Sequence, residues 1–62
     1  MTELDLFTAI EQDETGGLFV WGNYTIYWNA VTDEGELYRH HDFCAAGNSL
    51  SALAAKAVEL DA

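Results

Sequence analysis

Cationic side chains are scarce in this chain. Only Arg39 and Lys56 are reliably positive, against eleven carboxylates, so the formal net charge of the 62 residues is −9. Proteins bind DNA or RNA through Lys and Arg side chains that neutralise phosphates, and an anionic membrane surface repels a protein of this charge. The sequence therefore excludes direct binding of a nucleic acid and argues against a membrane partner.

Cysteine, proline and long apolar runs are also scarce or absent. Cys44 is the single cysteine, which excludes an internal disulfide and a multi-cysteine zinc site and agrees with a reducing cytosol. No apolar run approaches the ~20 residues of a membrane span, and the N-terminus lacks the pattern of a signal peptide. Without proline, repeats or a linker, we expect one cytoplasmic domain over residues 1–62.

Bulky apolar residues are abundant, which separates this chain from disordered acidic proteins. Half of the residues are hydrophobic and 13% are aromatic. Disordered acidic segments lack such residues, and each buried aromatic ring removes roughly 150–250 Å² from water. The composition therefore predicts a folded protein with a compact core.

The pattern predicts a helix at each end of the chain. Over residues 2–14, Thr2 can cap a helix whose narrow apolar stripe is formed by Leu6, Phe7 and Ile10, and Gly16-Gly17 can end it. From residue 50 onward, apolar residues recur at helical spacing after the cap Ser49. These are Leu50, Leu53, Ala54, Ala57 and Val58.

The middle of the chain is rich in β-branched and aromatic residues and predicts strands at residues 18–21, 24–31 and 36–43. A regular hairpin with its loop at residues 32–35 would place Val31 opposite Glu36. The face then expected to be buried carries Tyr24, Ile26, Trp28, Ala30, Leu37 and Phe43. The opposite, wet face would carry Thr25, Tyr27, Asn29, Tyr38, His40 and Asp42. Arg39 would stack on the indole of Trp28.

The predicted fold is therefore α+β, with the element order α-β-β-β-α. A three-stranded antiparallel meander is flanked by an N-terminal and a C-terminal helix. We expect a monomer, with a dimer as the alternative.

The sequence contains few residues in patterns that carry chemistry. Residues 40–44 hold the metal-capable cluster His-His-Asp-Phe-Cys, but on a strand His40 and Asp42 share one face while His41 points to the other. Residues 11–16 resemble the start of a calcium loop, but the twelfth position is Gly22 and not the required glutamate. We expect no metal and no cofactor.

Catalysis is also not expected. Cys44 with either neighbouring histidine is the only conceivable nucleophile and base, and no orienting group accompanies them. A chain of 62 residues leaves little room for a substrate pocket. We therefore predict a binding protein without catalytic residues.

Eight of the eleven carboxylates form three groups in the sequence: Glu11, Asp13 and Glu14; Asp33, Glu34 and Glu36; Glu59 and Asp61. Two groups fall at the C-termini of predicted helices, where the helix dipole disfavours anions by roughly 0.3–1 kcal/mol each. This placement suggests selection for a basic partner, which a field of one sign attracts. The predicted partner-binding residues are Glu11, Asp13, Glu14, Asp33, Glu34, Glu36, Asp42, Tyr27 and Tyr38.

In size, charge and aromatic-rich α/β build, the chain resembles the small phage-encoded anti-CRISPR proteins. The resemblance is one of type and implies an acidic DNA mimic that blocks target-DNA or PAM recognition by a Cas surveillance complex in a bacterial cytoplasm. Two alternatives remain open. One is an antitoxin-like protein that neutralises a basic partner, and the other is a halophilic protein whose acidity serves solubility in molar salt.

Overall fold

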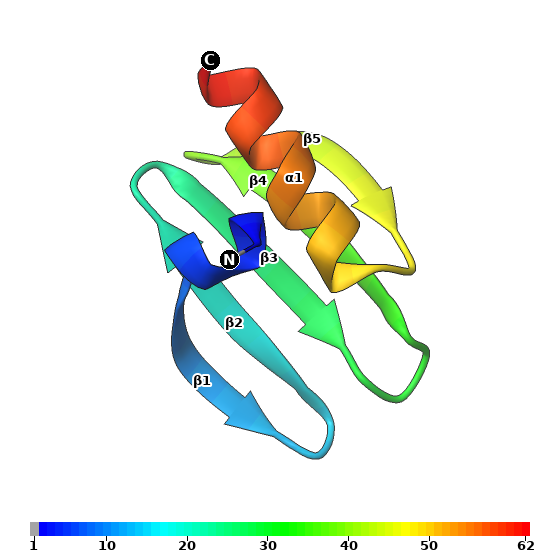
Figure 1. Cartoon of the computed structure of the whole chain (residues 1–62). Coiled ribbons are helices and arrows are strands. Elements are labelled where there is room, and N and C mark those ends of the chain that lie inside the picture. Colours follow the sequence, from blue (N-terminus) through cyan, green and yellow to red (C-terminus); the bar gives the residue numbers. More distant parts are fainter. Residues whose placement is uncertain (1) are drawn as a thin grey trace.

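A computed structural model describes residues 2–62 as a five-stranded antiparallel sheet with helical elements on one face (Figure 1). The strands lie in chain order, β1-β2-β3-β4-β5. The predicted three-stranded sheet between two helices is therefore wrong. Among the described residues, no helix has the length and apolarity to cross a membrane. The elements are η1 (Glu3–Leu6), β1 (Thr8–Asp13), β2 (Gly16–Trp21), β3 (Tyr24–Asn29), β4 (Glu34–Arg39), β5 (Asp42–Gly47) and α1 (Leu50–Asp61).

The N-terminal segment departs most from expectation, because residues 8–13 form an edge strand and not a helix. Only the short 3₁₀-helix η1 follows Thr2. The Asp13 carboxylate accepts hydrogen bonds from the backbone N–H groups of Thr15 (2.8 Å) and Gly16 (3.2 Å). These bonds stabilise a tight turn that places β1 beside β2. The backbone N–H and C=O groups of β1 then form hydrogen bonds with those of β2. Leu6, Phe7 and Ile10 therefore do not form one buried helix face. Ile10 lies on the strand and is 58% exposed.

The third predicted strand is divided into β4 and β5 by a two-residue turn at His40-His41. His40 adopts a left-handed backbone conformation with φ of 56°, and its N–H donates to the carbonyl oxygen of Asn23 at 2.8 Å. Because of the extra strand, Phe43 lies opposite Tyr38 and its side chain is 57% exposed. The prediction that Phe43 is buried was therefore wrong.

The register of β3 with β4 is offset by four residues from the predicted one. Ile26 lies opposite Leu37, and Tyr24 lies opposite Arg39. An even offset leaves every side chain on its predicted face, so the burial of Tyr24, Ile26 and Leu37 is confirmed. Trp28 lies opposite Gly35 and not Arg39, so the predicted stacking of Arg39 on Trp28 was wrong.

The core lies between the sheet and α1. The prediction of the C-terminal helix is confirmed, and the Ser49 side chain caps it by accepting from the Ala52 N–H at 3.2 Å. Gly35 lets β4 lie close beneath its neighbours, because a Cβ there would be 2.5 Å from the Trp28 ring and 2.9 Å from Leu53 Cδ1. The buried hydrophobic residues are Phe7, Phe19, Tyr24, Ile26, Leu37, Leu53, Ala54 and Ala57.

The Tyr24 hydroxyl is a polar defect in this core. It is buried and has no hydrogen-bond partner among the described residues. An unsatisfied buried polar group costs about 1–3 kcal/mol. We therefore expect Tyr24→Phe to raise the free energy of unfolding by about 1 kcal/mol in urea titrations. Tyr27→Phe, at a ring that is 53% exposed, is the control and should change it by less than about 0.5 kcal/mol. A less stable Tyr24→Phe would contradict the absence of a partner.

Candidate partner-binding face

One face of the sheet has no helix on it, because η1 and α1 both pack on the other (Figure 1). Apolar side chains nevertheless occur on this uncovered side. Leu18 lies directly opposite Tyr27, and Tyr38 lies directly opposite Phe43. We call this side of the sheet the open face, and its large apolar and aromatic residues are Leu18, Tyr27, Tyr38 and Phe43.

The three aromatic rings of the open face contact one another edge to face. The centroids of Tyr27 and Tyr38 are 5.4 Å apart at 88°, and those of Tyr38 and Phe43 are 5.8 Å apart at 81°. Such pairs contribute about 0.5–1.5 kcal/mol beyond the burial of their area. Mutual packing also restricts the rotamers of exposed rings, which lowers the entropy lost when a partner covers them.

Four carboxylates of the open face lie in two register rows across the sheet. One row runs Glu11, Leu18, Tyr27, Glu36, and the next runs Asp13, Gly16, Asn29, Glu34. All four acids are exposed. Three strand spacings separate the two acids of each row by about 14 Å, and two residues along a strand separate the rows by about 6.8 Å. We call Glu11, Asp13, Glu34 and Glu36 the corner carboxylates.

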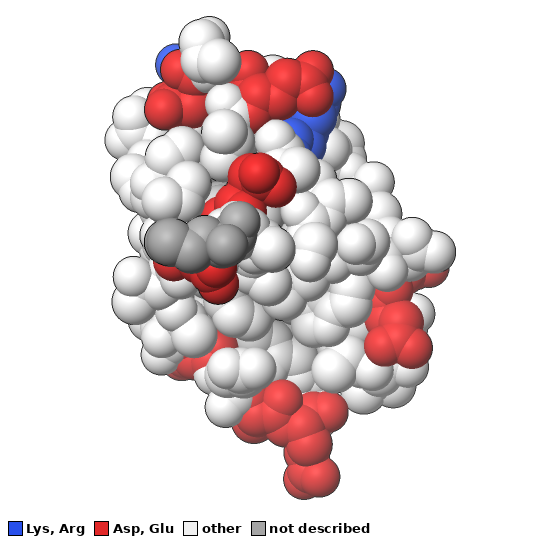
Figure 2. All heavy atoms as spheres, viewed as in Figure 1, with Lys and Arg blue, Asp and Glu red and all other residues white. Residues whose placement is uncertain are grey.

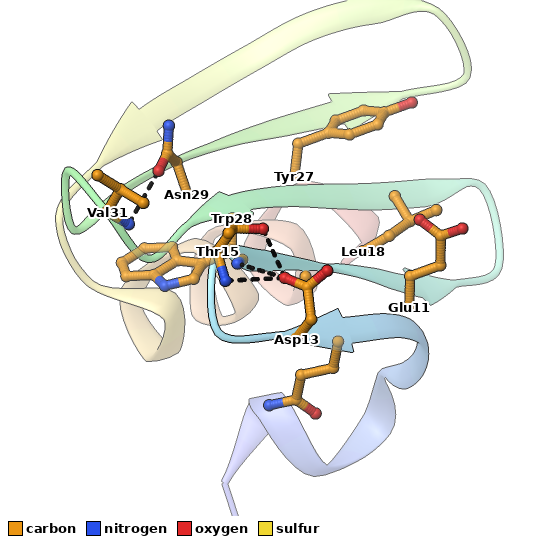
Figure 3. A pocket seen from close by; sticks show the side chains of 11 residues that line it. Glu11, Asp13, Thr15, Leu18, Tyr27, Trp28, Asn29 and Val31 are labelled. Carbon is orange, nitrogen blue, oxygen red and sulfur yellow. Dashed lines mark hydrogen bonds between the residues drawn. The ribbon is translucent and has the colours of Figure 1, made fainter.

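A hollow of about 610 Å³ lies between the corner carboxylates of β1 and the middle of the sheet. Figure 3 shows Glu11, Leu18 and Tyr27 projecting from the same side of the sheet around it. The same figure shows Asp13 at the adjoining turn, hydrogen-bonded to the backbone there. Acidic and apolar groups therefore adjoin one another on this face.

The β1–β2 and β3–β4 turns add two more acids, Glu14 and Asp33, at one end of the sheet. The Ala30 N–H donates to the carbonyl oxygen of Thr15 at 2.9 Å, which joins these turns directly. We call this region, formed by Asp13, Glu14, Asp33 and Glu34, the acid end. Figure 2 shows acidic groups at the bottom and right of the molecule, where Figure 1 places the β1–β2 and β3–β4 turns, and Lys and Arg atoms at the top, near the C-terminus.

Hydrogen bonds keep Asp13 of the acid end ionised. Its carboxylate accepts from the Thr15 hydroxyl as well as from the backbone N–H groups of Thr15 and Gly16. These bonds, with the Thr15 hydroxyl first, lower the pKa of Asp13 from its ordinary value. The charge therefore persists to more acidic pH than that of an unbonded aspartate.

The structure brings together all but one of the predicted partner-binding residues. Glu11, Asp13, Glu34, Glu36, Tyr27 and Tyr38 belong to the open face, and Glu14 and Asp33 lie in the adjoining turns. Asp42 is the exception, because it lies opposite Arg39, one position along each strand from the Tyr38–Phe43 pair, and successive residues of a strand point to opposite faces. We therefore exclude Asp42 from the site.

The third acidic group of the sequence is separate from the other two. Glu59 and Asp61 lie at the C-terminal end of α1, where Glu59 Oε1 is 3.5 Å from Lys56 Nζ. The dipole argument holds for this group alone, since the segment containing Glu11 and Asp13 is a strand.

Two residues of the open face were not predicted as part of the site. The sequence predicts a strand that contains Leu18 but not which side of the sheet its side chain occupies, and it predicts a core position for Phe43. The signal for Phe43 would have been the turn at His40-His41, but neither histidine is a residue typical of tight turns. Only the position of β5 shows that Phe43 belongs to the open face.

The metal-capable side chains do not converge. Within residues 2–62, no group of three or more His, Cys, Asp or Glu side chains is arranged to hold a metal ion. The thiol of Cys44, at a bulge of β5, donates to the carbonyl oxygen of Asp42 at 3.5 Å.

No protein-family model, curated protein or solved structure matches this chain. The chemistry of the open face and the acid end is therefore the basis on which we infer a function.

Proposed function

We propose that this protein is an acidic nucleic-acid mimic, which docks its open face and acid end on the nucleic-acid-binding surface of a basic protein. The observation that carries the proposal is the rectangle of corner carboxylates with Leu18 and Tyr27 between its sides. Residues far apart in the sequence share one face there, and no Lys or Arg of the described chain lies in these two register rows.

The dimensions of the rectangle suit a surface that binds a duplex. The distance between its two sides, about 14 Å, is comparable to the major-groove width of about 12 Å in B-DNA. The spacing along each side, about 6.8 Å, is of the order of the separation between successive phosphates of one strand. Every antiparallel sheet has these spacings. The particular feature of this chain is that carboxylates occupy all four corners.

Charge and aromatic groups contribute differently to docking. A field of one sign accelerates encounter with a basic surface, and it does so less as salt screens it. Affinity at protein interfaces comes chiefly from a few buried aromatic or charged side chains near the centre of the contact. Tyr27, which lies between the two sides of the rectangle and is 53% exposed, is suited to that central role.

A Cas surveillance complex is the target that we favour, because the chain is similar in size, charge and build to acidic anti-CRISPR proteins. Binding there would block target-DNA or PAM recognition by occupying the arginines and lysines that otherwise hold phosphates. The proposed action is stoichiometric and requires no catalytic residue. It takes place in a bacterial cytoplasm, with the inhibitor as a monomer.

The test is a competition between the protein and DNA for one partner. The chain is immobilised, purified Cas surveillance complexes and other basic nucleic-acid enzymes are passed over it, and duplex DNA containing the target and PAM is added. We expect capture of a nucleic-acid-binding protein, its displacement by DNA, and weaker binding as salt rises.

Two other results would contradict the proposal and support a different function. A captured partner that saturating DNA does not displace indicates an antitoxin-like protein that neutralises a partner elsewhere on its surface. A chain that captures none of these enzymes and folds only in molar salt indicates a halophilic protein whose acidity serves solubility.

A further inference from the structure

A second hollow on the open face adjoins the aromatic pair Tyr27 and Tyr38. It has a volume of about 430 Å³ and is lined by Tyr27, Glu36, Tyr38, His40 and His41. The two tyrosine rings stand at 88° to one another and form two walls of this space. Glu36 lies directly opposite Tyr27 and two residues before Tyr38. We call this hollow the tyrosine notch.

The Glu36 carboxylate gives the notch a negative charge. Its Oε2 accepts a hydrogen bond from the Tyr38 hydroxyl at 3.2 Å. No Lys or Arg among residues 2–62 forms an ion pair with it, so most of its acceptor capacity faces the hollow and solvent. Loss of solvent around the phenol, followed by the Glu36 charge, raises the pKa of Tyr38. The Tyr38 phenol is therefore neutral at neutral pH and can donate its proton to the Glu36 oxygen.

We propose that the tyrosine notch binds the guanidinium group of one arginine of the partner protein. A cation is attracted to the face of an aromatic ring within about 6 Å of its centroid. Guanidinium is planar, so it stacks on a tyrosine ring while donating two parallel hydrogen bonds to a carboxylate. The ammonium of lysine lacks this shape and is more strongly hydrated. Two aromatic walls beside a carboxylate thus favour arginine over lysine.

The identity of the partner rests on the proposed function, but the affinity of the notch for guanidinium does not. If both hold, the notch adds selectivity to a surface whose other acids act mainly through long-range charge. It would choose, among basic surfaces, those with an arginine at the matching position.

The experiment is an NMR titration of the full chain with N-acetyl-arginine amide. N-acetyl-lysine amide serves as a cation of different shape, and N-acetyl-citrulline amide as a neutral molecule of nearly the same shape as arginine. We expect the arginine compound to shift the ring resonances of Tyr27 and Tyr38 in a saturable manner. The lysine compound should bind several-fold more weakly and the citrulline compound should not bind.

Two variants separate the notch from the general acidity of the protein. Glu36→Gln removes the charge within the notch, and we expect arginine binding to weaken about fivefold or more. Glu11→Gln removes an equal charge from the same face, beside Leu18 instead of a tyrosine pair, and should leave binding within about twofold. Bound arginine should also lower the pKa of Tyr38 in the wild type, since a cation stabilises the phenolate.

The inference is overturned if citrulline shifts the tyrosine rings as arginine does, or if Glu11→Gln and Glu36→Gln weaken arginine binding equally. The experiments can reject the arginine-binding notch and the proposed function independently of one another. Arginine that binds in the notch, with no nucleic-acid enzyme captured, would support the notch and count against the mimic. A captured, DNA-displaced partner with no arginine binding in the notch would do the reverse.

Discussion

Reversal of two corner carboxylates, Glu11→Lys with Glu34→Lys, is expected to lower the affinity for the proposed basic partner at least about 100-fold. These residues stand at diagonal corners of the rectangle, on β1 and β4, so each substitution places a cation against the partner's own cations. Close charge pairs at interfaces couple by about 1.5–7 kcal/mol, and about 2.7 kcal/mol corresponds to 100-fold. Titration calorimetry or surface plasmon resonance at low salt measures the loss.

The chain offers a matched control for this reversal. Glu59→Lys with Asp61→Lys makes the same change in net charge at the end of α1, away from the open face, where cations suit the helix dipole. We expect this variant to retain its affinity within about threefold, since only the screened long-range field changes. Both variants should keep the circular dichroism spectrum of the wild type. Equal losses in the two variants would show that net charge alone, and not the open face, governs binding.

Leu37→Ala is expected to lower the free energy of unfolding by about 2–5 kcal/mol, as for other large-to-small core substitutions. Leu37 is fully buried on β4, directly opposite Ile26, which is also fully buried. A domain of this length has a total stability of only about 3–9 kcal/mol. The variant should therefore be marginally folded or unfolded at 25 °C in urea titrations followed by circular dichroism.

Val31→Ala is the control for the core substitution. Val31 is 74% exposed in the β3–β4 turn, so its truncation should change the stability by less than about 0.5 kcal/mol. A Leu37→Ala variant that loses no more stability than Val31→Ala would contradict the placement of β4 beneath α1.

The C-terminal helix was predictable because its signals are local. Ser49 caps it, and apolar residues recur every three or four positions from Leu50. The face that each side chain of β3 occupies was predictable for a related reason, since alternation along a strand does not depend on its partner. Both patterns are complete within a dozen residues.

The first segment was not predictable in the same way. Leu6, Phe7 and Ile10 match a short helical stripe, but residues 8–13 gain more from the backbone hydrogen bonds of β2 than from an isolated helix. A helix of this length is marginal in water. The turn that enables the pairing depends on one carboxylate, that of Asp13. Aspartate is common in turns, but Asp13 also fits the end of the expected helix, so the sequence alone does not decide between the two.

The acidic groups were visible in the sequence, but their grouping in space was not. Residues 11–14 and 33–36 are about twenty positions apart, and they meet because consecutive hairpins of a meander place alternate turns at the same end of the sheet. A three-stranded sheet, as predicted, contains no β1 to supply Glu11 and Asp13. The rectangle of corner carboxylates and the tyrosine notch both require the true strand count and register.

Charge, apolar content and the local patterns of residues 50–61 settled that this is a folded acidic domain ending in a helix, because those properties belong to single residues or to neighbours along the chain. Which carboxylates share a surface, and which aromatic rings stay outside the core, depended on long-range pairing. Strand order and the turn at His40-His41 decide that pairing through backbone hydrogen bonds. Nearly any strand can form such bonds whatever its side chains are, so the amino-acid sequence alone does not reveal which strands pair.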